Sequence, residues 1–212
     1  MENHIETKEM LPKEILYATT NDAKLKIMQS ILGDEYKVIS LRDAGFELQT
    51  EEDGISPVEN ALKKARYCYG QTGKPLLSMD FGFFIDGLPE DEQPGPSVKR
   101  IIPISKEREP TDEEVLEFYK NIITKLGGTA QAHWVRALAY VSRDGEFTTE
   151  IKIPKKLIDK PSEKRKKGFP MTSLQIDPLT GKYECELTDE ERAASHVAED
   201  EAVKLFIQEH VR

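Results

Sequence analysis

The chain has 212 residues, of which 38% are hydrophobic and 33% are charged, and its formal net charge is −9. This length suits one sizeable domain, the acidity argues against binding a nucleic acid polymer, and no apolar stretch approaches the roughly 20 residues that cross a membrane. Cys68 and Cys185 lack the spacing of metal ligands, which favours reduced thiols in a cytoplasmic protein with no membrane partner.

The first part of the chain alternates strand and helix patterns. Residues 1–13 lack the apolar core of a signal peptide, and we expect a flexible tail before a single domain at 14–212. Residues 15–19 predict a strand, and apolar side chains spaced by three or four predict a helix that ends at Gly33. A second strand is expected at 36–41.

The next helix has a clear start signal. Ser56 suits the N-cap, Pro57 suits the first helical position, and Glu59 is placed to close a capping box. Gly70 is a candidate end for this helix. A buried strand is then expected at 76–80, with a continuation at 83–86.

The second half of the chain predicts a helix and then a hairpin. Thr111 and Glu114 repeat the capping-box pattern at the start of the helix. Residues 133–142 and 147–153 predict two paired strands around an Asp-Gly turn, and the chain from Thr188 predicts helix with a break near Ser195-His196. Strand–helix alternation followed by a hairpin indicates an α/β fold with a mixed sheet.

Residues 18–24 lie where the first strand gives way to a helix. Thr20 or Asn21 could cap that helix, whose free backbone N–H groups would form an anion site, and Lys24 could reach the same anion. An ordinary N-cap followed by a surface lysine is the alternative. The segment lacks the glycines of a phosphate-binding P-loop.

Asp80 is the acidic residue that most suggests function, because its neighbours are apolar. Parallel strands share a carboxyl edge where ligands collect, so Asp80 and residues 18–24 are expected at one edge of the sheet. A divalent cation on phosphate oxygens needs one or two carboxylates, and an acid beside it can deprotonate the attacking water. The acids at 51–53 could contribute or could form a solvated loop.

The basic residues give weaker signals. Lys64 lies on the predicted helix that starts near Pro57, on a face that could turn toward a cleft. The run at 159–168 is typical of a solvated loop. His196 could cap, pack or bind, and taken alone it decides nothing.

Five segments, taken in order, resemble the inosine triphosphate pyrophosphatase family, whose members hydrolyse non-standard purine nucleoside triphosphates. The resemblance covers most of residues 14–205. The segments are ILYATTNDAK, EEDGISPVENALKKAR, LLSMDFGF, QPGPSVKR and GKYECELTDEERAASHV.

The resemblance implies an elongated central mixed sheet flanked by helices, in two lobes with a cleft between them, and a homodimer. It also implies a hydrolase that uses Mg²⁺, or Mn²⁺, to cleave the triphosphate into a monophosphate and pyrophosphate. Asp80, Lys64 and Glu52 are implied as catalytic, with Glu52 and Asp80 serving the metal. The residues implied to bind substrate are Thr19, Thr20, Asn21, Lys24, Phe169, Arg192, Ser195 and His196.

Several positions depart from the family pattern. Met79 stands at the first position of the family's pair of acids, and a thioether is a poor ligand for Mg²⁺. Either the protein binds the metal more weakly than the family pattern implies, or a neighbour such as Glu51 or Asp86 replaces the missing carboxylate. The aromatic and acidic residues of the base motif are replaced by Met171 and Thr172. The leading hypothesis is therefore a nucleoside triphosphate pyrophosphatase with an altered base pocket. The alternative is a nucleotide-binding protein with weak or no catalysis.

Overall fold

A computed structural model describes residues 12–19, 22–47 and 53–211. Within these residues, six strands form one sheet in the order β2–β1–β3–β4–β5–β6. β1 is parallel to β2 and β3, and the remaining neighbours are antiparallel, which confirms the expected mixed sheet. The strands are β1 (Lys13–Tyr17), β2 (Tyr36–Ser40), β3 (Leu76–Ile85), β4 (Thr129–Ser142), β5 (Gly145–Ile158) and β6 (Gln175–Ile176).

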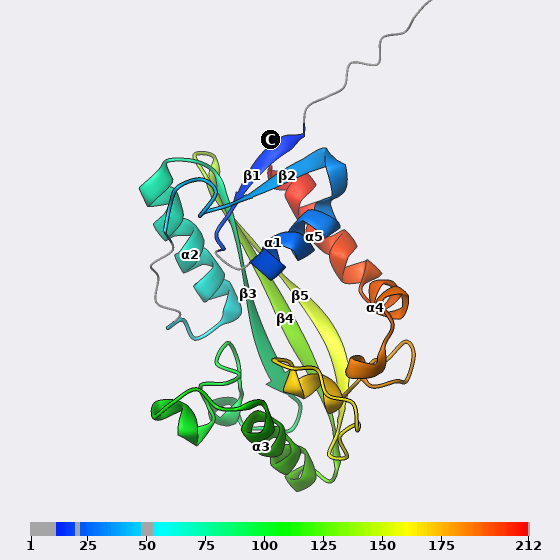
Figure 1. The fold of residues 1–212 in the computed structure, drawn as a ribbon. Coiled ribbons are helices and arrows are strands. Elements are labelled where there is room, and N and C mark those ends of the chain that lie inside the picture. The colour runs from blue at the N-terminus through cyan, green and yellow to red at the C-terminus, as the bar shows by residue number, and fades with distance from the viewer. Residues whose placement is uncertain (1–11, 20–21, 48–52, 212) are drawn as a thin grey trace, which may run out of the picture.

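The helices divide the sheet into two lobes (Figure 1). In the first lobe, α2 covers one face of the sheet and α1 and α5 cover the other. In the second lobe, α3 packs against the far ends of β3, β4 and β5. The α-helices in the described residues are α1 (Asp22–Leu32), α2 (Pro57–Thr72), α3 (Asp112–Lys125), α4 (Asp189–Ser195) and α5 (Val197–His210).

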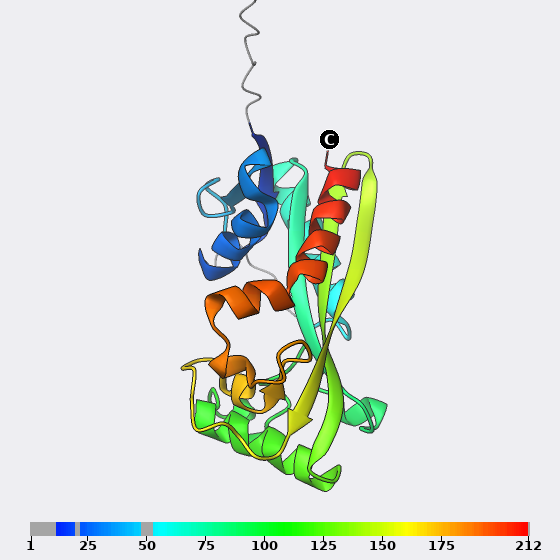
Figure 2. The same cartoon turned by 90° about the vertical axis from the view of Figure 1, so that its right-hand side faces the viewer.

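The β4–β5 hairpin joins the two lobes. Its strands pair without interruption from the turn at Ser142 and Gly145 to Thr129 and Ile158. At about 3.3 Å per residue, a strand of 14 residues is about 45 Å long, enough to run through both lobes (Figure 2). The elongated sheet with two lobes is therefore built on one continuous hairpin.

Each lobe has its own apolar core. Buried side chains fill the space between the sheet and α1 with α5, the space under α2, and the space between the sheet and α3. Representative members of these three clusters are, in that order, Met28 and Ile207, Ala61 and Ala65, and Leu116 and Tyr119.

The helix signals are confirmed with two differences. Thr111 and Glu114 form a complete capping box, and α4 and α5 are separated at His196 as expected. Ser56 caps α2, but the Glu59 carboxylate accepts from the Ile55 N–H instead of the Ser56 N–H. α2 also runs past Gly70 to Thr72. The cap is Gly73, at φ 64°, because a left-handed conformation favours glycine there.

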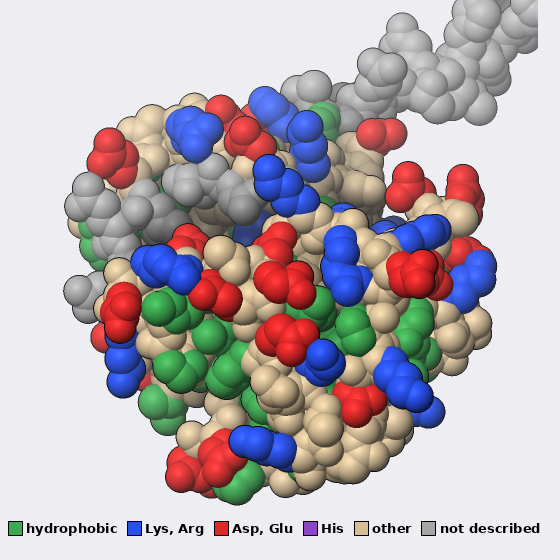
Figure 3. Space-filling model, turned by 60° about the horizontal axis from the view of Figure 1, so that its bottom comes forward, with side chains coloured by type: hydrophobic (Ala, Val, Ile, Leu, Met, Phe, Trp, Pro, Cys, Tyr) green, Lys and Arg blue, Asp and Glu red, His purple; other side chains and the backbone are tan. Residues whose placement is uncertain are grey.

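Two features of the structure concern the membrane and nucleic acid partners considered above. None of the described helices is long and apolar enough to cross a membrane. On the face drawn in Figure 3, acidic and basic side chains are interspersed, so neither positive nor negative charge dominates that face.

Most of the segment expected as a flexible tail, residues 1–11, lies outside the described residues.

Candidate active site

A cavity of about 550 Å³ lies beyond the carboxyl end of β1. β1 pairs with β3 only at Leu76 and Leu77, so β3 continues past the end of its neighbour. The cavity extends from this edge into the second lobe. Its lining includes Lys24, Asp80, Arg136 and His196 at one end and Gln175 and Glu184 at the other. Ligands of α/β sheets collect at such strand ends, which makes this cavity the candidate active site.

Asp80 and Lys64 form a buried ion pair on the cavity wall. Lys64 Nζ lies 2.8 Å from Asp80 Oδ1, and the two residues are 3% and 7% exposed. The buried face of α2 includes Asn60, Ala61, Lys64, Ala65 and Cys68. This three-to-four spacing places Lys64 in the stripe that packs on the sheet. Lys64 therefore turns inward and contacts Asp80, but it is not among the residues that line the cavity.

Asp80 lies in the middle of a strand instead of at its end. β3 runs through to Ile85, so the two strands expected at 76–80 and 83–86 are one. Successive side chains of a strand point to opposite faces. Ser78 and Asp80 therefore face α2, where Ser78 Oγ donates to the Ala61 carbonyl.

Met79 faces the other side of the sheet. Its side chain is 4% exposed and belongs to the core between the sheet and α1 with α5. The thioether therefore packs as a core residue on the face opposite the Asp80 carboxylate.

Arg136 adds a second cation at this end of the cavity. It lies on β4 opposite Phe81, its Nη1 is 2.9 Å from Asp200 Oδ1, and its guanidinium lies over the Phe81 ring at 5.9 Å. The Tyr17 hydroxyl is close enough to interact electrostatically with Arg136 and Asp80. Burial raises the pKa of Tyr17 well above its usual value, so the hydroxyl stays protonated.

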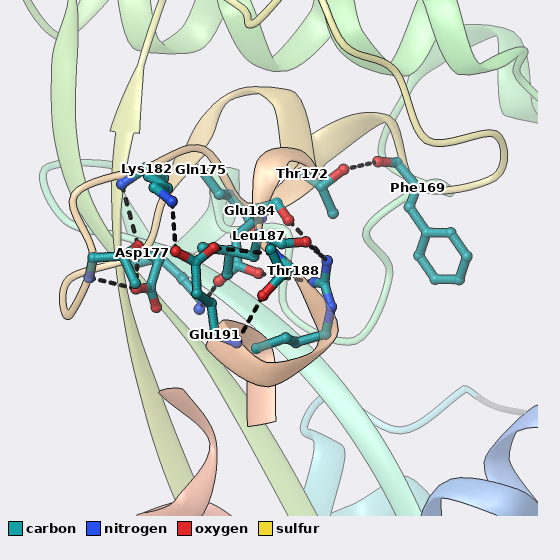
Figure 4. Close-up of polar contacts among 12 residues, drawn as sticks. Phe169, Thr172, Gln175, Asp177, Lys182, Glu184, Leu187, Thr188 and Glu191 are labelled. Atoms are coloured by element: carbon teal, nitrogen blue, oxygen red, sulfur yellow. Dashed lines mark hydrogen bonds and ion pairs between the residues drawn. The ribbon is translucent and has the colours of Figure 1, made fainter. Parts of the chain in front are cut away.

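The other end of the cavity has apolar walls and buried polar groups. Trp134, Ile153 and Met171 line the walls. The Lys155 ammonium and the Arg192 guanidinium both pair with the Glu184 carboxylate. Figure 4 shows Glu184 among the polar contacts at this end. Lys155 and Glu184 are 5% and 4% exposed, so this pair is held away from solvent.

The residues expected at the site separate into four groups. Lys24, Asp80, Phe169 and His196 line the cavity, and Lys64 reaches it through Asp80. Thr19 is buried just after β1. Of the described residues, Arg192 and Ser195 do not line the cavity, and Arg192 instead contacts Glu184 and the Leu187 carbonyl. Thr20, Asn21 and Glu52 lie outside the described residues.

Asp80 is compatible with a Mg²⁺ ion. In the described part of the chain, no group of three or more His, Cys, Asp or Glu side chains could hold a metal. Mg²⁺ is commonly bound by one or two carboxylates, with substrate phosphates and waters as its other ligands. Asp80 supplies one carboxylate, the smaller of those two numbers. Asp86 lines a different hollow, with Ile55 and His133, and Glu51 lies outside the described residues.

Several residues of the cavity lining were missed by reasoning from the sequence, and five of them give it much of its polar and aromatic character. These are Trp134, Arg136, Lys155, Gln175 and Glu184. The polar pairs among them join segments far apart in the chain, such as Lys155 with Glu184, 29 residues on. A signal was present only at Arg136, a lone charge within the apolar run 132–141.

Known proteins resemble this chain over most of its length. Proteins named dITP/XTP pyrophosphatase from Campylobacter jejuni subsp. jejuni and Yersinia pseudotuberculosis are each 30% identical to it. The alignments cover 86% of this chain and 90% of the first protein, and 92% of this chain and 96% of the second.

Solved structures agree with the sequence relatives. The structure of a HAM1 protein from Coxiella burnetii superposes with a TM-score of 0.74 at 26% identity, covering 93% of this chain and 99% of that one. A dITP/XTP pyrophosphatase from Mycobacterium abscessus superposes with a TM-score of 0.71, also at 26% identity, over 91% and 98% of the two chains. The sequence pattern of the Ham1 family matches residues 15–207. With the sheet, the two lobes and the cavity in place, the chain belongs to the Ham1 family.

Proposed function

We propose that this protein is a nucleoside triphosphate pyrophosphatase that releases a monophosphate and pyrophosphate. The observation that carries the proposal is the buried Lys64–Asp80 pair on the wall of the cavity. The names of the relatives support it, because two proteins 30% identical to this chain are called dITP/XTP pyrophosphatases. A buried charge pair opening onto a cavity is typical of a catalytic site.

In this proposal Asp80 is the general base. Lys64 contacts Oδ1 and holds the carboxylate in place, which leaves Oδ2 to accept a proton from a water molecule. The water oxygen bonds to the α-phosphorus, the bond from that phosphorus to the α–β bridging oxygen breaks, and pyrophosphate leaves with the bond electrons. Lys24 and Arg136 line the same end and suit the phosphate oxygens. Lys64 also supplies a fixed cation near the developing charge.

Asp80 would hold a divalent metal together with water and the phosphates themselves. When bound, Mg²⁺ or Mn²⁺ neutralises phosphate charge and orients the reacting groups. Glu52 and the phosphate-loop residues Thr20 and Asn21 belong to this proposal through the family resemblance alone.

The base is proposed to occupy the end of the cavity in the second lobe. Trp134 and Met171 offer apolar surface there, and Phe169 lies at the rim with 58% of its surface exposed. Lys155, Gln175 and Glu184 supply buried polar groups at this end. In this proposal, the base pocket is the part of the site that differs from the family pattern. His196 lines the cavity and would lie between the base and the phosphates, whereas Ser195 belongs to this proposal through the family resemblance alone.

A homodimer and a cytoplasmic location complete the proposal. Both rest on the family resemblance, and the free thiols of Cys68 and Cys185 agree with a reducing compartment. Burial raises the pKa of the Cys68 thiol to about 11, which excludes it as a nucleophile at neutral pH. Light scattering on the purified protein would test the dimer.

The test is pyrophosphate release from a panel of ribo- and deoxyribonucleoside triphosphates, with Mg²⁺ or Mn²⁺. We expect turnover of at least one triphosphate and a loss of about 10²- to 10⁴-fold in kcat for Asp80→Asn. Asp86→Asn is the matched control, because Asp86 lines a different hollow. Binding without turnover across the panel would contradict the proposal and favour a nucleotide-binding protein.

A further inference from the structure

Residues 163–168 form a strongly basic loop that borders the cavity. The basic loop holds four consecutive cations and one acid, Glu163, and all of its residues are exposed. Its four cations are Lys164, Arg165, Lys166 and Lys167. Gly168, which ends the basic loop, and the next residue, Phe169, line the cavity. The basic loop therefore reaches the rim of the proposed active site.

The backbone of the basic loop is held at both of its ends. The Gly168 N–H donates to Asp112 Oδ2, which lies 2.7 Å away at the start of α3. At the other end, the Lys164 N–H donates to Ser162 Oγ over 3.1 Å, and the Ser162 hydroxyl donates to the Glu186 carboxylate. The charge run is exposed to solvent as expected, but its cations project from a fixed place at the rim.

Within the described residues, none of the four cations forms an ion pair with a carboxylate. Other exposed cations, such as Lys37 and Arg108, do pair with acids. The Lys166 ammonium instead lies over the Phe169 ring, 5.1 Å from its centroid, which joins one cation of the basic loop to the lining of the cavity. The positive charge of the basic loop is therefore available to an anion that approaches the rim.

This local charge opposes the charge of the whole molecule. The formal net charge of −9 repels a polyanion such as a nucleoside triphosphate. Salt screens exposed charges that are more than about 8 Å apart at physiological ionic strength, so the nearest charges decide the force on a ligand at the rim. A cleft bordered by charge opposite to that of its ligand raises the association rate by about 10- to 10³-fold. The basic loop is placed to have this effect.

We propose that the basic loop captures the polyphosphate of the substrate and speeds its entry into the cavity. The chain after β5 belongs to the second lobe and α1 to the first, and both lie on the same side of the sheet (Figure 2). Lys24 of α1 lines the same cavity, so the captured triphosphate passes from the basic loop to the cations at the other end. This inference rests on the proposed function, because it assigns the entry step of that reaction.

Trp134 supplies an intrinsic probe of entry, because it is the single tryptophan of the chain and lines the cavity. Stopped-flow fluorescence with dITP measures the association and dissociation rate constants. The parent protein is Asp80→Asn, which removes turnover, or the wild type in EDTA if that variant does not fold. In the loop variant, glutamine replaces all four cations. We expect its association rate constant to fall at least about tenfold at low salt, with little change in dissociation.

A matched control separates the position of the charges from their number. In the control variant, glutamine replaces four exposed cations that do not line the cavity, Lys37, Lys74, Lys125 and Arg143. Both variants lose four positive charges, so an effect of net charge alone would be equal in the two. We expect the control variant to bind dITP nearly as fast as the parent. Added salt should slow the parent and the control variant much more than the loop variant.

The outcomes separate this inference from the proposed function. Equal association rates in the parent and the loop variant, equal losses in the two variants, or no dITP binding by fluorescence and calorimetry would each overturn the inference. A loop variant that binds dITP normally but loses affinity for a single-stranded oligonucleotide would also overturn it, in favour of a nucleic acid polymer. Pyrophosphate release from the triphosphate panel decides the proposed function independently. Circular dichroism and thermal melting identify any variant that has lost its fold.

Discussion

Lys64 places a charged ammonium group where α2 packs against the sheet. Removing two charges from water costs free energy, and only a well-paired geometry offsets that cost. The 2.8 Å contact with Asp80 supplies that pairing, and a second contact of 3.4 Å joins Nζ to the Met79 carbonyl. The lysine therefore has two functions in our proposal: it holds the carboxylate and it contributes a cation to the cleft.

Replacement of this lysine tests both functions. We expect Lys64→Met to lower the free energy of unfolding by about 3–5 kcal/mol, because the Asp80 carboxylate is left buried and unpaired. Urea denaturation measures the change, and pyrophosphate release from the folded fraction should also fall. Lys120→Met is the control, since the Lys120–Glu117 pair is exposed and an exposed pair contributes at most about 1 kcal/mol. Equal losses in the two variants would argue against a special role for Lys64.

At the scale of single residues, the sequence predicted one side of the site better than the other. Lys24, Lys64 and Asp80 lie on regular elements whose apolar periodicity fixes the buried face, so their placement follows from local pattern. Lys155 and Glu184 meet because β5 and the residues after β6 fold onto each other. Nothing within either segment of the sequence indicates that contact.

At the scale of elements, the approach of α2 to β3 depends on a missing side chain. A Cβ atom at Gly82 would lie 2.5 Å from Pro57 Cγ and 3.2 Å from the Gly95 carbonyl carbon. The first turn of α2 and the loop after β3 therefore both pack directly against the backbone of Gly82. This close packing helps to set the position of Lys64 opposite Asp80.

Two glycine-to-alanine changes test this packing. We expect Gly82→Ala to destabilise the protein by about 1–3 kcal/mol, because an overpacked core must shift its neighbours. Gly70→Ala is the matched control: a Cβ there meets nothing within 4 Å, and alanine in the helix should add about 0.5–1 kcal/mol. Thermal or urea unfolding measures both. A neutral Gly82→Ala would show that α2 can move away from β3 at little cost.

The start of α3 makes a prediction about acid stability. The Arg108 guanidinium and the Thr111 N–H lower the pKa of Glu114 from 4.5 to about 2. A carboxyl group with a depressed pKa stabilises the fold fully above about pH 4.5, and this contribution is lost as the pH falls toward 2. Arg108→Met should therefore flatten the fall in melting temperature over that range. Arg143→Met, whose side chain is 89% exposed, should leave the fall unchanged. Parallel pH profiles for the wild type and Arg108→Met would refute the assignment.

The element boundaries show where local signals suffice. The capping box at Thr111 and the helix break at His196 were predicted because local side-chain chemistry decides them. The extents of β3, β4 and β5 were underestimated. β3 continues through Gly82 because β4 supplies a ladder along its whole length, and such pairing between distant segments overrides a local break.

At the scale of the whole molecule, the cavity lies where the two lobes meet the shared sheet. A ligand that contacts Lys24 and Arg136 at one end and Gln175 at the other would connect elements of both lobes. Ligand binding to the folded state should therefore raise the stability of the entire protein by mass action.

Thermal melting tests this coupling without turnover. In the Asp80→Asn variant, dITP at one hundred times its dissociation constant should add about 2.7 kcal/mol to the free energy of unfolding. We expect one cooperative transition that moves to higher temperature. Two transitions, of which only one responds to dITP, would show that the lobes unfold separately and that the ligand contacts one of them.

The chain order of the two cores has a consequence during synthesis on the ribosome. The core of the second lobe is complete once residue 174 has emerged, since its buried members lie between Phe83 and Leu174. In the first lobe, the cluster between the sheet and α1 with α5 unites β1 with Val203, Phe206, Ile207 and Val211, so it cannot close until the last helix has been translated. One face of the earliest strands therefore stays exposed while the middle of the chain folds. Nascent β1 and β2 are consequently the segments that most need shielding from aggregation.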